Sequence, residues 1–167
     1  VPAVAQVKNF TAVTREMLMN PSPDDWLMLS RTYDEQRHSP LNQITKQNVG
    51  QLRMAWARGF TPGVQETVPL VYNGVMYVAA PGPVVQALDA RSGCIHWTYQ
   101  AKGPVRSAMV AATDGPNTTL VFSDQNGWVH SIDARTGASV WKIRVEPHEA
   151  TRLTGAAAVL DGVAFIP

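Results

Sequence analysis

The sequence of 167 residues predicts an all-β fold made from a repeated four-strand unit. Three observations support this: a stretch of 11 residues occurs twice, short apolar runs lie between turn signals, and those turns recur about every 8–12 residues. The repeated stretch begins at Ala87 and again at Ser131, which gives a period of 44 residues. Because a period of roughly 40–50 residues is typical of one propeller blade, we expect a β-propeller.

The repeated stretch combines a turn with an outer strand that carries tryptophan. An Asp side chain can accept hydrogen bonds from backbone N–H groups two residues further on, and Gly allows a positive φ before the strand. The Trp on that strand can pack against the next blade and bury roughly 150–250 Å², so its predicted role is structural. The matching residues are Asp89, Ala90, Arg91, Gly93 and Trp97 in the first copy and Asp133, Ala134, Arg135, Gly137 and Trp141 in the second.

Short apolar runs place the strands around these markers. In the first unit, Asn73-Gly74 is a hairpin turn. In the second unit, a longer turn is expected at Thr113–Thr118. A third unit begins with Ala156–Leu160 and an Asp161-Gly162 turn. The other expected strands are Val68–Tyr72, Val75–Ala80, Val84–Leu88, Ile95–Tyr99, Ala108–Ala112, Leu120–Ser123, Trp128–Ile132 and Ser139–Val145.

The N-terminal third has a different pattern. Val13–Met19 is predicted to be a helix that ends at Asn20-Pro21. Thr45–Leu52 is predicted to be a short helix capped by Thr45. Leu52–Gly59 contains Trp56 and is expected to be the outer strand of another blade. The predicted organisation is an N-terminal helical and loop segment at 1–52 and a partial propeller at 53–167. Its units are 64–101, 102–145 and an incomplete 150–167, about two and a half blades in all.

Composition limits the class of protein. With 45% apolar and 16% charged residues, the chain is expected to fold around a core. A net charge of +1 gives no electrostatic reason to expect nucleic acid as a partner, and no apolar run is long enough for a membrane span. The single cysteine, Cys94, excludes an internal disulfide and a multi-thiolate metal site.

The two ends of the sequence carry a prediction each. No basic segment followed by an apolar one comes after Val1, so we expect that a secretory signal has been removed or lies outside this sequence. The hairpin that reaches Pro167 stops after about four residues of its second strand, which favours truncation over a natural edge strand.

Three segments resemble a known family. Asp25–Ile44, Asn48–Trp56 and Gln65–Tyr77 are similar to the N-terminal signature of alcohol dehydrogenases that depend on pyrroloquinoline quinone (PQQ). The repeat with Trp97 and Trp141 resembles the tryptophan docking motif of that family's eight-bladed propeller. The resemblance covers about residues 13–167.

This resemblance implies a periplasmic or secreted quinoprotein that oxidises an alcohol to an aldehyde or ketone and passes electrons to cytochrome c. PQQ would lie in the axial channel beside Ca²⁺ or a lanthanide, where a hard cation polarises the quinone carbonyl. The family's metal ligands and catalytic Asp come from later blades, outside this chain. We therefore name no catalytic and no metal-binding residue here, and we expect the chain to be inactive without the missing blades. Many members carry two adjacent cysteines that form a disulfide against PQQ, but Gln100–Val105 contains none, and Cys94 is expected on an outer strand, buried and inert.

Three polar residues are the candidate cofactor-binding set. Glu66, Arg106 and Thr154 are expected just before the innermost strand of successive blades, positions that gather at one end of a propeller's channel. The family's PQQ-binding Glu, Arg and Thr stand in similar local sequences, and a guanidinium suits carboxylate or quinone oxygens. The alternative is that Glu66 and Arg106 are rim residues that pair with one another.

Two functional classes remain open from the sequence. The first is the N-terminal part of a PQQ-dependent alcohol dehydrogenase with an alcohol substrate. The second is a non-catalytic propeller scaffold with the same docking repeat, as in the outer-membrane assembly lipoprotein, which acts through protein–protein contacts. The signature at Asp25–Ile44 and the three polar residues favour the first. The histidines His38, His96, His130 and His148 show no metal-ligand spacing, and His96 and His130 are expected in strands as packing or surface residues.

Overall fold

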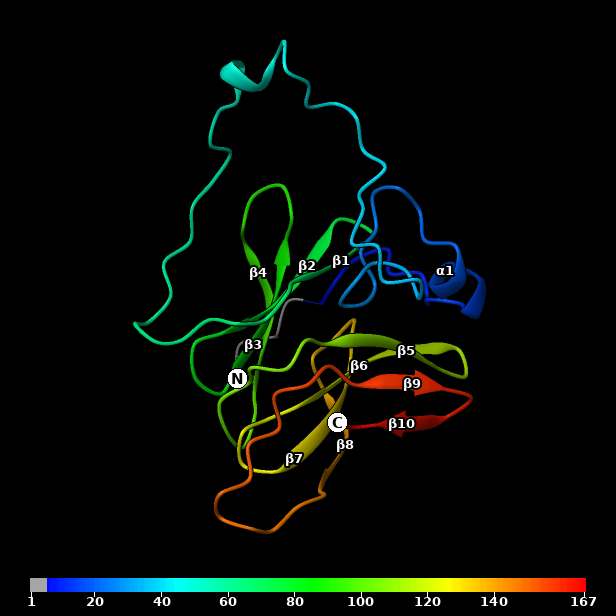
Figure 1. Cartoon of the computed structure of the whole chain (residues 1–167), viewed down its shortest axis with the longest axis vertical. Coiled ribbons are helices and arrows are strands. Elements are labelled where there is room, and N and C mark those ends of the chain that lie inside the picture. Colours follow the sequence, from blue (N-terminus) through cyan, green and yellow to red (C-terminus); the bar gives the residue numbers. More distant parts are fainter. Residues whose placement is uncertain (1–5) are drawn as a thin grey trace.

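A computed structural model describes residues 6–167. It contains two four-stranded antiparallel sheets, ordered β1-β2-β3-β4 and β5-β6-β7-β8, and a separate β9–β10 hairpin (Figure 1). These sheets confirm the predicted all-β propeller architecture. The elements are α1 Arg15–Met19, a 3-10 helix Val49–Gln51, β1 Leu70–Tyr72, β2 Val75–Ala80, β3 Val84–Asp89, β4 Ile95–Gln100, β5 Val110–Asp114, β6 Asn117–Ser123, β7 Trp128–Asp133, β8 Ser139–Arg144, β9 Ala158–Leu160 and β10 Val163–Phe165.

One predicted turn is wrong. The expected loop Thr113–Thr118 is a tight hairpin instead, because β5 and β6 extend until Asp114 pairs with Asn117. Strand β5 accordingly begins at Val110 rather than Ala108. The Gly115-Pro116 pair alone makes the turn, and the ladder gains residues that a loop would have left unpaired.

The two sheets are joined by the tryptophan that the repeat predicted. Trp97 of β4 is 1% exposed, and its indole nitrogen donates a hydrogen bond to the carbonyl oxygen of Ala134 at 3.1 Å. Gly137, at φ 72°, lies so close to the indole that a Cβ there would be 2.7 Å from the ring. The Tyr77 ring also packs beside the indole, with its centroid 5.8 Å from that of Trp97. The predicted structural role of Trp97 is thus confirmed.

The N-terminal segment packs against one end of both sheets. The helix begins where the Thr14 hydroxyl accepts a hydrogen bond from the Met17 N–H, and it ends before Pro21, so it is two residues shorter than predicted. The N–H of Val7 donates to the carbonyl oxygen of Arg135, and the N–H of Val13 donates to the Thr118 hydroxyl. Both partners lie at the end of the sheets where β5 finishes and β6 begins. The N-terminal segment is thus attached at the end of the sheets that carries the β5–β6 and β7–β8 turns.

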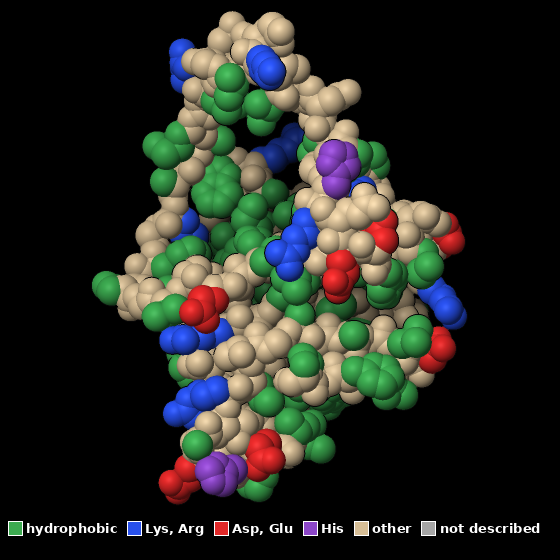
Figure 2. Space-filling model, in the orientation of Figure 1, with side chains coloured by type: hydrophobic (Ala, Val, Ile, Leu, Met, Phe, Trp, Pro, Cys, Tyr) green, Lys and Arg blue, Asp and Glu red, His purple; other side chains and the backbone are tan. Residues whose placement is uncertain are grey.

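Residues 38–64 form an arm that leaves the sheets and returns (Figure 1, cyan to green). Two predictions fail here. The helix expected at Thr45–Leu52 is only one 3-10 turn at Val49–Gln51, and Leu52–Gly59 is not a strand, because no described strand lies beside it to supply hydrogen bonds. Hydrophobic side chains lie along the surface of the arm (Figure 2, green). The exposed apolar residues of the arm are Leu41, Ile44, Val49, Leu52, Met54, Phe60 and Val64.

Trp56 nevertheless anchors the arm as a docking tryptophan. Its indole nitrogen donates to the carbonyl oxygen of Ala90 at 3.0 Å, and a Cβ on Gly93 would be 2.7 Å from its ring. Trp97 makes the same pair of contacts with Ala134 and Gly137 one period later. The contact that the repeat encodes is therefore present at Trp56 even without strand geometry around it.

Candidate functional site

The three candidate cofactor-binding residues occupy equivalent places in the fold. Each stands four residues before an inner strand: Glu66 before Leu70 of β1, Arg106 before Val110 of β5 and Thr154 before Ala158 of β9. All three therefore lie at the same end of the sheets. It is the end opposite to the packed N-terminal segment.

Glu66 is held against β2 by its two neighbours. The side-chain amide of Gln65 and the hydroxyl of Thr67 both donate to the carbonyl oxygen of Ala79. Gly63 lies directly against Pro81, where a Cβ would be 2.7 Å from the proline Cβ. The segment therefore has a fixed path, and Glu66 itself projects from it with half of its side chain exposed.

Arg106 meets Glu66 across the gap between the two sheets. The N–H of Val105 donates to the carbonyl oxygen of Gly82 at 3.1 Å, which ties the segment before β5 to the β2–β3 turn. The Arg106 Nη1 then lies 3.6 Å from Glu66 Oε2, with 31% and 51% of the two side chains exposed. This is an ion pair and not a close hydrogen bond, so the guanidinium keeps donors free for an oxygen ligand.

Thr154 is not joined to the other two. It is exposed in the segment before β9, and no hydrogen bond links its side chain to another residue in the described range 6–167. The structure thus brings Glu66 and Arg106 together and leaves Thr154 as a separate polar group at an equivalent position. The assignment of all three to a cofactor stays a prediction.

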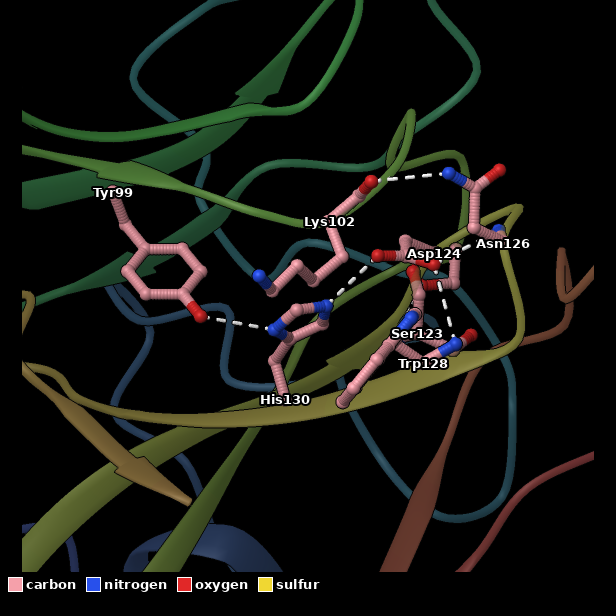
Figure 3. Close-up of polar contacts among 8 residues, drawn as sticks. Tyr99, Lys102, Ser123, Asp124, Asn126, Trp128 and His130 are labelled. Atoms are coloured by element: carbon pink, nitrogen blue, oxygen red, sulfur yellow. Dashed lines mark hydrogen bonds and ion pairs between the residues drawn. The ribbon is translucent and has the colours of Figure 1, made fainter. Parts of the chain in front are cut away.

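The structure also contains a buried polar chain that the sequence did not reveal. Asp124 and His130 are both fully buried, and His130 Nε2 lies 2.9 Å from Asp124 Oδ2. The other ring nitrogen of His130 is 2.9 Å from the hydroxyl of Tyr99, which comes from the neighbouring sheet (Figure 3). His130 also stacks on Phe122 with ring centroids 5.1 Å apart. His130 is therefore a packing residue, as expected, but one with two specific polar partners.

The carboxylate of Asp124 has enough donors to stay charged in the interior. Burial by itself raises the pKa of Asp124, but hydrogen bonds from His130 and from the N–H groups of Asn126 and Trp128 outweigh burial and lower that pKa below 3.8. Burial raises the pKa of the Tyr99 hydroxyl, which therefore remains protonated and able to donate. Each ring nitrogen of His130 thus has one partner: Nε2 faces the Asp124 carboxylate, and Nδ1 lies within hydrogen-bond distance of the Tyr99 hydroxyl.

The only sequence signal for this cluster was the turn that contains Asp124. Asp124–Gly127 reads as an ordinary hairpin turn, and neither Tyr99 nor His130 stands out in its strand pattern. Their contact joins strands β4 and β7 of different sheets, so only the packing of the sheets reveals it.

The segment Gln100–Val105, which contains no cysteine, carries a lysine. Lys102 Nζ lies 5.9 Å from the centre of the Trp128 ring, within cation–π range. Cys94 itself is exposed and precedes β4, which corrects the prediction of a buried thiol on an outer strand. Within residues 6–167, no group of three or more His, Cys, Asp or Glu side chains is placed to hold a metal ion. The described helices also include none that is long and apolar enough to cross a membrane.

Comparison with known proteins places this geometry in a family. Residues 26–115 match the model for the PQQ glucose/ethanol/alcohol dehydrogenase β-propeller domain. The chain is 37% identical to quinohemoprotein alcohol dehydrogenase ADH-IIG of Pseudomonas putida, over 91% of this chain and 23% of the relative. It is 38% identical to 1-butanol dehydrogenase (cytochrome c) of Thauera butanivorans, over 78% of this chain and 20% of the relative.

Solved structures give the same answer. The structure of ADHIIG from Pseudomonas putida HK5 superposes with a TM-score of 0.78 at 33% identity, covering 93% of this chain and 24% of that chain. A europium-containing methanol dehydrogenase superposes with a TM-score of 0.77 at 26% identity, covering 91% of this chain and 29% of that chain. The chain thus spans between a fifth and a third of the length of these relatives. It belongs to the PQQ-dependent alcohol dehydrogenase family and represents part of the family's β-propeller.

Proposed function

We propose that this chain supplies the N-terminal blades of a PQQ-dependent alcohol dehydrogenase and that Glu66, Arg106 and Thr154 contact the cofactor there. The observation that carries this proposal is the position of the Glu66–Arg106 pair. Both residues stand four places before an inner strand at the same end of the sheets, each on an anchored segment, and their charged atoms are 3.6 Å apart. A propeller's channel opens at such an end.

The residues fit the chemistry of the cofactor. PQQ carries carboxylates and quinone oxygens, for which a partly exposed guanidinium is a suitable donor. Glu66 would fix the orientation of Arg106 through the ion pair, and Thr154 would add a hydroxyl donor. Bound PQQ would accept the two electrons and two protons that an alcohol loses when it becomes an aldehyde or ketone. The electrons would then pass to a cytochrome c.

The remaining features of the enzyme are proposed on its family membership. Ca²⁺ or a lanthanide would be bound by residues of other blades, since no metal-binding cluster occurs within residues 6–167. The compartment would be the periplasm or the exterior. The missing blades are thus the first partner that this chain needs, and the predicted boundaries at 1–52 and 53–167 remain proposals as well.

The test is PQQ binding by a complete propeller that contains this chain. Arg106→Ala is expected to weaken PQQ binding roughly 10- to 100-fold, the loss that follows removal of a hydrogen bond to a charged group. Arg144→Ala is the matched control, because Arg144 ends the outer strand β8 at the same end of the sheet. Fluorescence titration with PQQ measures both. Equal affinities of Arg106→Ala and wild type would refute the assignment, and no binding by the wild type would favour a non-catalytic scaffold.

A further inference from the structure

The buried pair Asp124 and His130 is absent from the first blade. The 44-residue period places Asp124 on Ala80 and His130 on Gln86. The strand pairing agrees, because His130 lies opposite Phe122 in one sheet and Gln86 lies opposite Val78 in the other. The four-strand unit therefore folds without a buried carboxylate at this place. Since burying a charge is costly unless it is fully hydrogen-bonded, the second blade retains a feature that its fold does not require.

The Asp124 carboxylate shapes the turn between β6 and β7. Its Oδ1 accepts hydrogen bonds from the N–H groups of Asn126 at 2.9 Å and Trp128 at 3.2 Å. Its Oδ2 faces His130 Nε2 at 2.9 Å, and the imidazole is held in turn by Tyr99 of the other sheet. Both carboxylate oxygens are thus occupied, and the turn is fixed from inside the protein.

That turn is hydrogen-bonded to the segment that carries Arg106. The N–H of Gln125 donates to the carbonyl oxygen of Pro104 at 2.9 Å, and the Asn126 amide donates to the carbonyl oxygen of Lys102 at 3.0 Å (Figure 3). On the other side of Arg106, the fully buried Ser107 hydroxyl donates to the Ser123 carbonyl oxygen at 2.8 Å and accepts from the Ser123 N–H at 3.0 Å.

We infer that Asp124 and His130 are positioning residues for Arg106: they hold the 124–127 turn against residues 102–107 and so fix where the guanidinium is presented. Arg106 lies between Pro104 and Ser107, which are both held by hydrogen bonds. Among residues 6–167, no hydrogen bond or ion pair joins the Arg106 side chain to Asp124 or His130. The pair acts through the backbone. Its role toward PQQ rests on the proposed function, whereas its effect on Arg106 does not.

The first experiment uses NMR of the 167-residue chain without any ligand. Asp124→Ala removes all three acceptor contacts and is expected to accelerate amide exchange at Gln125 roughly tenfold or more and to shift the Arg106 side-chain Nε–Hε signal. Asp133→Ala is the matched control. Asp133 ends the same strand, β7, and its carboxylate accepts from the Thr136 N–H and hydroxyl, but at the opposite end of the sheet. It should leave the Arg106 signal in place.

Conservative replacement separates the positioning role from a general loss of stability. Asp124→Asn keeps the Oδ1 acceptor and presents an N–H to His130, so the turn and the Arg106 signal should return toward wild type. At the same time, the His130 ¹⁵N shifts should change, because Nε2 then faces an amide N–H donor in place of a carboxylate oxygen. His130→Gln is the second variant if Asp124→Ala does not fold, because Gln86 fills this place in the first blade. It should accelerate Gln125 exchange while Asp133→Ala does not. An Arg106 signal that moves equally in Asp124→Ala and Asp133→Ala, or in neither, would overturn the inference.

A second measurement distinguishes this inference from the proposed function. In a complete propeller titrated with PQQ, Asp124→Ala should raise the dissociation constant several-fold, with Arg106→Ala raising it further. If Arg106→Ala leaves PQQ affinity unchanged while the NMR results hold, the cofactor assignment fails and the positioning role stands. If Arg106→Ala weakens binding but Asp124→Ala changes neither the affinity nor the Arg106 signal, the positioning role fails alone.

Discussion

The indole N–H of Trp97 and the carbonyl oxygen of Ala134 form a buried hydrogen bond of 3.1 Å between two sheets. Gly137, three residues after Ala134, supplies the flat surface on which the indole lies. The Ala and the Gly belong to one turn of the second sheet, and the Trp belongs to the outer strand of the first. Trp56 makes the same pair of contacts with Ala90 and Gly93 although it lies three residues nearer to them in sequence.

Adding a methyl group at this contact should lower the free energy of unfolding. Gly137→Ala places a Cβ 2.7 Å from the Trp97 ring, and overpacking of this kind costs about 1–3 kcal/mol of unfolding free energy. Gly74→Ala is the control, because Gly74 has nearly the same φ, 75° against 72°, but open space around it. Urea unfolding followed by tryptophan fluorescence measures both. Equal midpoints for the two variants would show that backbone strain, and not the tryptophan, dominates.

Trp56 should control access of proteases to the arm. Trp56→Ala removes the hydrogen bond to Ala90 and the packing on Gly93, so trypsin should cleave at Arg53 and Arg58 roughly tenfold faster. Trp141→Ala should leave that rate unchanged, because Trp141 is 42% exposed and lies on β8, outside this contact. Timed digestion with mass spectrometry gives the rates. Similar cleavage in wild type and Trp56→Ala would mean that the anchor does not restrain the arm.

The Glu66–Arg106 pair should matter little for stability. Its atoms are 3.6 Å apart and half of the Glu66 side chain is exposed, and pairs of this kind contribute about 0–1 kcal/mol. Glu66→Gln and Arg106→Ala should therefore each change the unfolding free energy by less than about 1 kcal/mol. Denaturant titration of each variant measures this change. A loss well above that amount would indicate the structural alternative, in which the two residues serve mainly to hold the sheets together.

Acid should destabilise the chain partly through Asp124. The pKa of Asp124 in the folded protein lies below its ordinary value of 3.8, so the ionised carboxylate stabilises the fold above that value. This contribution is lost as the pH falls below about 3.8 toward the folded pKa. Asp124→Asn cannot titrate, so its unfolding free energy should depend less on pH in that window. Parallel slopes for wild type and Asp124→Asn would contradict the assignment.

Much of the fold follows from local patterns in the sequence. The strands adjoin turns whose chemistry is visible in the sequence, such as Asn73-Gly74 and Asp89–Gly93, and the repeat marks how the sheets meet. The predictions fail where the structure of a segment depends on what packs or pairs beside it. Thr45–Leu52 has too few packing partners for a helix, since the arm lies away from the sheets, and Leu52–Gly59 has no described strand beside it.

The candidate site divides in the same way. Glu66, Arg106 and Thr154 could be placed by counting back from each inner strand, because that distance is constant along the chain. The distance between the charged atoms of Glu66 and Arg106 could not be predicted, because it depends on the angle between two sheets. The contact of Tyr99 with His130 was inaccessible for the same reason, as the two residues come from different blades.

Strand β8 is expected to limit the concentration at which this polypeptide stays soluble. Its residues are exposed throughout, and they include Trp141 and Ile143 at 42% and 56% exposure. A row of large apolar groups on an edge strand invites other molecules to stack on it, so aggregation should set the limit in storage and crystallisation. Lys142 and Arg144 alternate with these groups and supply the repulsion between molecules that opposes aggregation. Solubility should therefore fall as salt screens those charges.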